Sequence, residues 1–380
     1  MKICYIAHES NLTGANRSLM DILSCCKKNQ VEPLVIIPKK GMIEEELNKM
    51  KIKYKIIKYK TCIDSNFIKN KLKIILNYLA IIKIEKILKE ENIDIVHNNS
   101  LLIDVGIKAA YNLKLPYICH IREFGIEDHN LKFLNQKELF SYLENARYII
   151  GISKCIFDKF SKLVSNDNFK LIYNGVNFKE HNQMKKNLLD NNKINMIIVG
   201  RICEGKGQLE AIKAIEYLIN EGINNLKLYI VGDGIKGEKY YNKLKIYVFN
   251  KKLSNYVKFI QFTKDLREFR KNCDIALICS RNEAFGRVTI ESMLAKQLVI
   301  GANTGGTIEL IENKVTGLLY EQGNYINLSE NIKFAIENKD KSKEMIKAGY
   351  IKAKENFLIE RTMSEVKKLY SEINKNGIIQ

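Results

Sequence analysis

The chain contains no tryptophan, and only three of its 380 residues are proline. Because proline interrupts helices and central strands, this scarcity allows long stretches of regular secondary structure. The nine cysteines include no C-x-x-C pair, so the usual spacing of a zinc or redox site is missing. We therefore interpret the cysteines as small buried side chains of a protein in a reducing compartment.

Long hydrophobic runs are missing as well. The most hydrophobic uncharged stretch, Ile74 to Ile82, is far shorter than the roughly 20 residues of a membrane-spanning helix. The N-terminus begins with a strand-like run, Ile3 to Ala7, and lacks the charged head and apolar core of a signal peptide. We expect a cytoplasmic protein that does not span a membrane.

Positive charge is in excess, with 62 lysines and arginines against 43 acidic residues and a net charge of +19. Residues 49–89 concentrate it, because they hold 12 lysines and only two acidic residues. A nucleic-acid-binding protein would interleave basic residues with stacking aromatics or carry a known binding module, and neither is found. We expect no nucleic acid among the partners.

The first half of the chain alternates short β-branched runs with amphipathic helical stretches. Parallel strands need long crossover connections, so this alternation predicts a parallel sheet covered by helices on both faces. We assign residues 1–178 to one doubly wound, Rossmann-like α/β domain on the acceptor side. Its predicted strands are residues 2–8, 32–38, 53–59, 93–99, 116–122 and 146–153.

A polar, asparagine-rich segment interrupts the alternation, and we place a linker at residues 179–193. The alternation then resumes and predicts a second doubly wound domain over residues 194–357, followed by a C-terminal helix, residues 358–380, that can return to the first domain. Two such domains present the carboxyl ends of their strands to a central cleft, where open α/β sheets bind ligands. The predicted strands of the second domain are residues 196–200, 227–232, 257–262, 275–280 and 298–302.

A glycine-rich turn with two cations follows the first strand of the second domain, in Gly200-Arg201-Ile202-Cys203-Glu204-Gly205-Lys206-Gly207. The strand end, the turn and the next helix N-terminus supply backbone N–H donors, and Arg201 and Lys206 add two positive charges. This arrangement favours a diphosphate ligand. A solvated basic loop has the same composition, and the pattern alone leaves that alternative open.

Two carboxylates eight positions apart follow a buried strand, in Glu283-Ala284-Phe285-Gly286-Arg287-Val288-Thr289-Ile290-Glu291. We predict Glu283 in the loop at the sheet edge and Glu291 on the helix that begins near Arg287. Such a pair can accept hydrogen bonds from two hydroxyl-bearing groups of one extended ligand. Carboxylates on a helix surface are the alternative.

These two motifs occur in order with Ile230-Val231-Gly232-Asp233-Gly234 and Gly305-Gly306-Thr307-Ile308-Glu309. Together they resemble the retaining nucleotide-sugar glycosyltransferases of family 4, which have the two-domain GT-B fold. The resemblance spans nearly the whole chain. It implies transfer of a sugar from a nucleotide diphosphate donor, UDP-linked, to a saccharide or lipid-linked saccharide acceptor. The anomeric configuration would be retained, and the product would be a cell-surface polysaccharide or glycolipid.

The resemblance also implies roles for individual residues. Arg201 and Lys206 would hold the donor diphosphate, Glu291 the ribose hydroxyls and Glu283 the transferred sugar. Gly14 matches the glycine turn after the family's first strand and would flank the donor phosphate or the acceptor. Backbone amides would approach sugar hydroxyls and phosphate where side chains leave room, at Phe285, Gly286, Gly305 and Gly306.

One histidine matches the family too. His120 ends a predicted strand and corresponds to the histidine that family members place beside the donor sugar. A lone histidine is often structural, but a strand end at a ligand-binding edge favours a functional role. His8 is a weaker candidate. The remaining histidines, interpreted as structural or surface residues, are His97, His129 and His181.

The chain departs from the family pattern at Lys296 and Leu298, where family members usually have a helix-ending glycine and a proline. Both positions are structural. Residues 232–237 spell G-x-G-x-x-G, but they follow the second strand of their domain and no acidic residue ends the next strand, so we discount a nicotinamide site. No D-x-D pair is present for a metal-bound diphosphate. We therefore expect no metal and no other cofactor.

Two questions stay open. A nucleotide-sugar epimerase shares this architecture and would turn over without any acceptor. A predicted helix in the basic segment places Ile68, Leu72, Ile75, Leu79 and Ile82 on one face with lysines beside them. That face suits an anionic surface on the inner side of the membrane, and it equally suits an ordinary helix that packs on its sheet.

Overall fold

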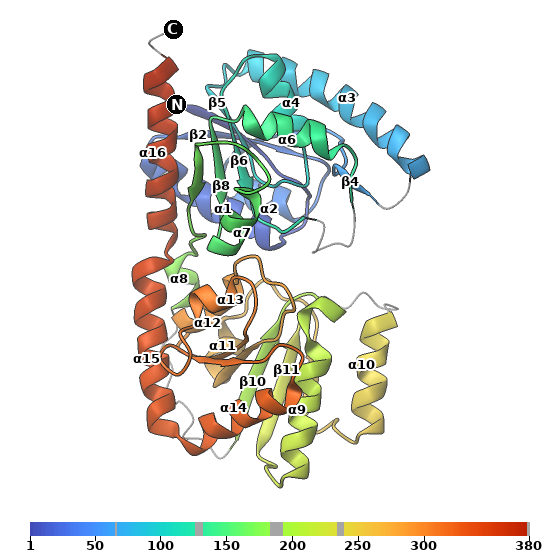
Figure 1. Ribbon diagram of the computed structural model, residues 1–380, viewed down its shortest axis with the longest axis vertical. Coiled ribbons are helices and arrows are strands. Elements are labelled where there is room, and N and C mark those ends of the chain that lie inside the picture. Colours follow the sequence, from blue (N-terminus) through green and yellow to red (C-terminus); the bar gives the residue numbers. More distant parts are fainter. Residues whose placement is uncertain (65–66, 126–131, 183–192, 234–238, 378–380) are drawn as a thin grey trace. The chain divides into compact units, whose positions relative to one another are not determined.

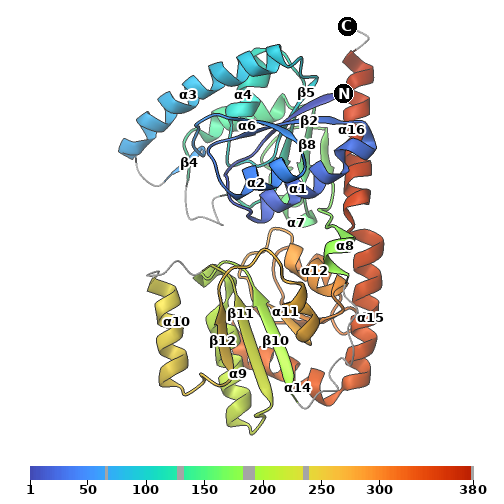
Figure 2. The same ribbon diagram turned by 180° about the vertical axis from the view of Figure 1, so that it is seen from behind.

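The structure, a computed structural model, describes residues 1–64, 67–125, 132–182, 193–233 and 239–377. The chain divides into two compact units, shown in Figures 1 and 2. Unit 1 comprises residues 1–175 and 359–380, and unit 2 comprises residues 176–358. Most of the predicted linker, residues 234–237 of the G-x-G-x-x-G segment and His129 lie outside the described residues.

Unit 1 is built on a parallel sheet with the strand order β3-β2-β1-β5-β6-β8-β9. The chain builds the sheet outward in both directions from the neighbouring strands β1 and β5, as in doubly wound folds. The central strands are buried on both faces, which explains their runs of isoleucine and valine. The strands are β1 (Lys2–Ile6), β2 (Glu32–Ile37), β3 (Lys53–Ile56), β5 (Ile95–Asn98), β6 (Tyr117–Ile121), β8 (Tyr148–Gly151) and β9 (Phe169–Leu171).

The last helix of the chain, α16 (Ile359–Gly377), belongs to the core of unit 1. It packs beside α1 and buries Met363, Val366 and Tyr370 among the side chains of β1 and α1. Each large apolar side chain buried in this way stabilises the unit by about 1.5–3 kcal/mol. The other helices are α1 (Gly14–Cys26), the 3-10 helix η1 (Lys27–Asn29), α2 (Met42–Lys49), α3 (Phe67–Glu90), α4 (Val105–Asn112), α6 (Gln136–Glu144) and α7 (Lys154–Phe160).

Helix α3 lies along α4 at the outside of unit 1, as Figure 1 shows. It buries Ala80, Ile84 and Leu88, yet its opposite side is apolar too. Within the described residues, no helix is both long enough and apolar enough to cross a bilayer. A short antiparallel pair, β4 (Ile63–Asp64) and β7 (Lys132–Phe133), lies outside the main sheet.

Unit 2 is built on a second parallel sheet with the order β12-β11-β10-β13-β14-β15. Its strands are β10 (Ile194–Val199), β11 (Leu226–Val231), β12 (Val257–Ile260), β13 (Ile275–Ile278), β14 (Leu298–Ala302) and β15 (Leu318–Tyr320). Its helices are α8 (Phe178–His181), the 3-10 helix η2 (Glu204–Lys206), α9 (Gln208–Asn220), α10 (Lys239–Asn250), α11 (Arg267–Asn272), α12 (Arg287–Leu294), α13 (Thr307–Leu310), α14 (Tyr325–Glu337) and α15 (Lys339–Asn356).

The predicted fold class is confirmed, because both sheets are parallel and doubly wound. Every strand predicted from the sequence is present. The structure adds the edge strands β9 and β15, which have only three residues each and therefore show no clear hydrophobic run. The cysteines are free, and burial raises the pKa of the Cys26 and Cys279 thiols to about 12, which keeps them protonated and unreactive.

Candidate active site

The turn after β10 lies where the strand order of unit 2 reverses. Strands β11 and β13 flank β10 on opposite sides, and open α/β sheets bind ligands beyond the carboxyl ends of strands at such a point. Gly207 closes the turn with φ +70° and begins α9. A Cβ at Gly207 would lie 2.1 Å from the carbonyl oxygen of Cys279, so only glycine allows this close approach. The N-terminus of α9 thus lies at the ligand-binding edge of the sheet.

Lys206 and Glu283 meet across this reversal point. The Nζ of Lys206 donates a hydrogen bond of 2.8 Å to Oε2 of Glu283, and both side chains are partly exposed. The two residues are far apart in sequence, but they follow the adjacent strands β10 and β13. Arg201, on the same turn as Lys206, is exposed. An exposed cation beside a charge-assisted pair gives this edge two positive groups that an anionic ligand can reach.

Two glycine segments shape the loop that carries Glu283. The backbone N–H of Gly306 donates to the carbonyl oxygen of Glu283 at 2.6 Å. A Cβ at Gly305 would lie 2.5 Å from that same oxygen, and one at Gly306 would lie 2.6 Å from the carbonyl oxygen of Phe285. Both glycines are therefore needed for the loops to pack. Phe285 is buried, and its ring packs in a T-shaped contact with that of Phe357.

Glu291 lies on α12 and is 5% exposed. Its Oε2 accepts a hydrogen bond from the fully buried Arg270 of α11, and its Oε1 lies 3.4 Å from Nη2 of Arg287. His181 extends the cluster, because its Nδ1 lies 3.1 Å from Nη1 of Arg270. The carboxylate thus has two cationic partners, and a carboxylate offers about four lone-pair sites in all.

These cations control the ionisation of Glu291. Burial alone would raise the pKa of its carboxyl group, but the positive charges of Arg270 and Arg287 outweigh burial and hold that pKa well below its usual value. Glu291 is therefore a permanent anion at neutral pH. An ionised carboxylate is the stronger acceptor for hydroxyl groups.

In unit 1, Gly14 is the first residue of α1. A Cβ at Gly14 would meet no atom within 4 Å, so the packing of the protein does not require glycine there. Just after β1, the Nε2 of His8 lies 2.9 Å from Oε1 of Glu9. Burial opposes ionisation of Glu9, but the hydrogen bond and charge of His8 lower the pKa of this carboxyl group.

His120 lies within β6 and is completely buried. Its Nδ1 lies 3.1 Å from Nη2 of Arg122 and 3.2 Å from Nε2 of His97. Burial, and then the charge of Arg122, hold the pKa of His120 well below its usual value. His120 is therefore neutral at pH 7.

Several residues of these clusters were not predicted as site residues. Arg270 and Arg122 gave no signal, because a basic residue at the end of a short strand or helix usually points to solvent. His97 and His181 were interpreted as structural or surface residues, and the structure shows both in contact with the groups described above. His97 and His120 lie on two strands that were expected to be neighbours in the sheet. That expectation could have predicted that the two histidines lie close together.

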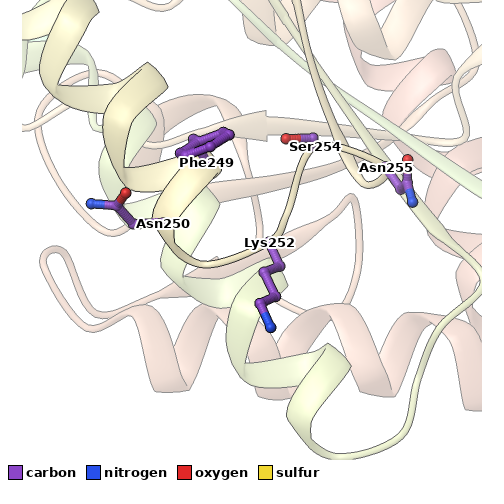
Figure 3. Close-up of a pocket in the computed structure, with 5 residues that line it drawn as sticks. All are labelled: Phe249, Asn250, Lys252, Ser254 and Asn255. Atoms are coloured by element: carbon purple, nitrogen blue, oxygen red, sulfur yellow. The ribbon is translucent and has the colours of Figure 1, made fainter.

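Other features of the described residues lie away from these groups. No cluster of three or more histidine, cysteine or acidic side chains that could hold a metal ion occurs in the described part of the chain. An open hollow of about 520 Å³ lies between α10 and the amino end of β12 (Figure 3). It is far along the sheet from the carboxyl ends of the strands, and none of the candidate residues lines it. Its lining residues are Phe249, Asn250, Lys252, Ser254 and Asn255.

Two family models match the chain, "Glycosyltransferase Family 4" over residues 12–180 and "Glycosyl transferases group 1" over residues 179–352. Between them they cover most of both units. The chain belongs to the family 4-like glycosyltransferases. The family predicted from the four motifs is thus confirmed, and glycosyl transfer is the class of activity of this protein.

Individual relatives agree with this assignment. An uncharacterized glycosyltransferase of Methanocaldococcus jannaschii is 29% identical over 299 residues, which are 76% of this chain and 78% of the relative. A Campylobacter jejuni enzyme, named as the N-acetyl-D-galactosaminyltransferase of a GalNAc-GalNAc-diNAcBac-PP-undecaprenol, is 23% identical over 98% of this chain and 99% of its own. The structure of Anabaena HepE in complex with UDP superposes with a TM-score of 0.82 at 22% identity, over 98% of this chain and 100% of that one. This structural likeness establishes the GT-B fold.

The buried cluster around Glu291 leads to a stability prediction. Glu291 has a depressed pKa in the folded state, so its ionisation stabilises the fold above its unfolded-state pKa of about 4.3, and this contribution is lost as pH falls through the folded-state pKa. Arg270→Gln removes the main partner of the carboxylate. We expect it to lower the free energy of unfolding at pH 7 by about 3–5 kcal/mol, measured by urea denaturation.

The loss should shrink as pH is lowered from 7 to 4, because Glu291 in the variant becomes protonated and no longer needs a cation. Arg267→Gln on the same helix is the matched control, since Arg267 is exposed and its surface ion pair with Asp265 should contribute little to stability. An Arg270→Gln loss that is equally large at both pH values would contradict the electrostatic explanation.

Proposed function

We propose that this protein is a retaining glycosyltransferase whose donor is a UDP-sugar and whose acceptor is a saccharide or lipid-linked saccharide of a cell-surface polysaccharide or glycolipid. The observation that carries the proposal is the Lys206–Glu283 contact at the strand reversal point of unit 2. It combines a cation and a carboxylate with a helix N-terminus at the edge where such sheets bind nucleotides.

Unit 2 is proposed to bind the donor diphosphate at the turn after β10. Lys206, Arg201 and the N-terminus of α9 supply positive charge and N–H donors for the phosphate oxygens. Lys206 pairs with Glu283, and a diphosphate would compete for its Nζ. Glu283 would then be released to accept hydrogen bonds from hydroxyls of the transferred sugar. The complexes of Anabaena HepE with UDP and with UDP-glucose support a UDP-linked donor.

Glu291 is proposed to bind the ribose hydroxyls. Arg270 and Arg287 keep its carboxylate ionised and occupy only part of its acceptor capacity. The ring hydroxyls of a ribose can therefore bind to the remaining lone pairs without removing either arginine. Phe285, Gly286, Gly305 and Gly306 would offer backbone groups to the sugar and phosphate.

In the proposed reaction, the bond from the anomeric carbon to the phosphate oxygen breaks and a bond to the acceptor oxygen forms. Lys206 and Arg201 stabilise the negative charge that develops on the leaving UDP. The acceptor hydroxyl passes its proton to an oxygen of the departing phosphate on the same face of the sugar, so the configuration is retained. The arginine, lysine and helix-end charges do the work that a metal ion would otherwise do, and we propose a reaction without metal.

The name of the Campylobacter relative supports a lipid-linked acceptor, since it describes a sugar chain on undecaprenol diphosphate. A capsular polysaccharide biosynthesis glycosyltransferase of Staphylococcus aureus, 27% identical over 51% of this chain, supports a role in polysaccharide synthesis. The epimerase alternative finds no support in these relatives.

The apolar side of α3 supports a membrane-bound acceptor. The exposed fractions of Leu72, Ile75, Tyr78, Leu79 and Ile82 lie between 47% and 73%. A helix that is apolar all around is normally covered, so this side needs a partner. Three exposed lysines, Lys83, Lys86 and Lys89, follow on the same helix. Apolar residues followed by cations match the interface of an anionic bilayer, and we propose that α3 docks on the inner leaflet.

A donor screen tests the proposed function. Purified protein incubated with a panel of nucleotide sugars and candidate acceptors should release UDP from UDP-sugars and form a glycoside, in the presence of a chelator as well as without it. The anomeric coupling in the proton spectrum of the product should match that of the donor. Sugar isomerisation without acceptor would favour an epimerase, and a product of opposite anomeric configuration would refute retention.

Single substitutions separate the proposed roles. We expect Arg201→Ala and Lys206→Ala each to reduce turnover by roughly 10²-fold or more, because they stabilise leaving-group charge. Glu291→Ala should weaken binding of free UDP, whereas Glu283→Ala should mainly reduce turnover, since only Glu283 is proposed to contact the sugar. Calorimetry with UDP and steady-state kinetics give the two readouts.

The matched control is Lys243→Ala, because Lys243 is an exposed lysine of α10 in the same unit. Near-normal turnover in both the Arg201 and Lys206 variants would rule out the diphosphate assignment. Unchanged UDP affinity in Glu291→Ala would rule out the ribose assignment.

Vesicle co-sedimentation tests the membrane surface. The wild type should bind vesicles that contain anionic lipid and should lose binding as salt is raised. Replacing Ile75 and Leu79 by glutamate, or Lys83, Lys86 and Lys89 by glutamate, should abolish it. Reversal of Lys339, Lys341 and Lys347 on α15 is the charge control and should have a smaller effect. Ile68, Lys69 and Lys71 belong to the same helix, but the structure describes only their backbone and not their side chains, so none of these variants changes them. Absence of wild-type binding at low salt would favour a soluble acceptor.

A further inference from the structure

Arg122 is held by three side chains at the carboxyl edge of the unit 1 sheet. Its Nε donates to Oδ1 of Asn99 at 2.9 Å, and its Nη1 donates to Oδ1 of Asn174 at 2.5 Å. Its Nη2 lies 3.1 Å from Nδ1 of His120. Arg122 is 5% exposed, and the planar fork of its guanidinium leaves little freedom to turn once the two asparagines are in place. The third contact, to His120, is thereby fixed.

This contact determines where His120 carries its hydrogen. A guanidinium has five N–H groups and no acceptor, so Nδ1 of His120 must accept the hydrogen bond. In a neutral imidazole the hydrogen then resides on Nε2. The pKa of His120 is far below its usual value because of burial and the neighbouring Arg122, so the ring does not hold both hydrogens near neutral pH.

His97 lies beside His120. Its Nε2 lies 3.2 Å from Nδ1 of His120, and its Nδ1 lies 2.5 Å from the hydroxyl of Tyr370. Burial and the charge of Arg122 lower the pKa of His97 to about 3, so this ring is neutral as well. Among these neighbours, Arg122 is the one that can only donate, so its contact sets the position of the hydrogen on His120.

The arrangement leaves one group without a partner. Nε2 of His120 is buried and has no hydrogen-bond partner among the described residues. Buried N–H groups are rarely left unsatisfied, and an exception at a ligand-binding sheet edge indicates a place for a ligand acceptor. The group that satisfies it must offer an oxygen lone pair, because Nε2 carries the hydrogen.

We propose that Arg122 is a positioning residue that fixes His120 as the Nε2–H tautomer, so that His120 donates a hydrogen bond to a substrate oxygen at the carboxyl edge of the unit 1 sheet and takes no proton from the acceptor. The proposal rests on the proposed function, because it takes the ligand of His120 to be a substrate of the transferase. It assigns to His120 the role of a fixed neutral donor, and it gives Asn99 and Asn174 the role of holding Arg122 in place.

Nuclear magnetic resonance tests the tautomer without reference to activity. In protein with ¹⁵N-labelled histidine, two-bond proton–nitrogen correlations distinguish the Nε2–H from the Nδ1–H form, and loss of one signal set in His120→Gln assigns His120. We expect the Nε2–H pattern in the wild type, unchanged between pH 6 and pH 8. An Nδ1–H pattern, or titration of this ring within that range, would overturn the proposal whatever the substrate is.

Kinetics test the donor role. The side-chain amide of glutamine can place an N–H near the position of Nε2, whereas methionine has no donor. His120→Gln should retain kcat within about tenfold of the wild type, and His120→Met should lose roughly 10²-fold or more, with UDP affinity unchanged in both. Equal losses in the two variants would indicate a proton-accepting or purely structural histidine and would refute the donor role.

Substitution of Arg122 completes the test. Arg122→Lys keeps the charge but cannot reach three partners at once, so we expect His120 to show a mixture of tautomers and kcat to fall while UDP affinity stays the same. Arg147→Lys, at an exposed arginine of the same unit, is the matched control. A wild-type tautomer pattern in Arg122→Lys would overturn the positioning role. If the wild-type donor screen fails while the tautomer is as expected, the proposed function is wrong and the tautomer assignment stands.

Discussion

The reversal of strand order between β10 and β13 is the constraint on which the donor half of the site depends. It brings the turn after one strand against the loop after another, so that Lys206 and Glu283 meet although a large part of unit 2 separates them in the chain. Glycine is required on both sides of this contact, at Gly207 and at Gly305, because backbone approaches backbone there. The charges at the edge therefore follow from the topology of the sheet.

Each unit also buries an arginine that fixes the ionisation state of a neighbouring side chain. Arg270 keeps Glu291 ionised inside a protein environment that would otherwise favour the neutral acid. Arg122 contacts His120 and contributes to keeping it neutral. An arginine suits both tasks, because its charge is permanent and its donors point in fixed directions. The same type of side chain thus stabilises an anion in unit 2, through Arg270, and a neutral ring in unit 1, through Arg122.

The sequence predicted the parts of the molecule that depend on local pattern. Alternating runs located the central strands, and the turn at Gly200 to Gly207 and the pair Glu283 and Glu291 stood out by spacing. The edge strands β9 and β15 were not predicted, because three residues carry too little periodicity. Arg270 was not predicted either, since its partner lies on another helix and only the packed fold reveals that the guanidinium is buried. The roles of the residues predicted to bind the substrate depend on contacts with that substrate, and a local sequence pattern carries no information about those contacts.

The path of the chain has a consequence for how the protein is made. Unit 1 contains β1, but its core includes Met363, Val366 and Tyr370 of α16, which are synthesised after the whole of unit 2. Unit 2 is therefore an insertion within unit 1 in terms of chain order. During translation, unit 2 has its complete sequence before unit 1 does, whereas N-terminal domains generally fold first. Until α16 leaves the ribosome, the apolar surface of α1 and β1 stays without its cover, and early termination near the C-terminus removes part of the core of the N-terminal unit.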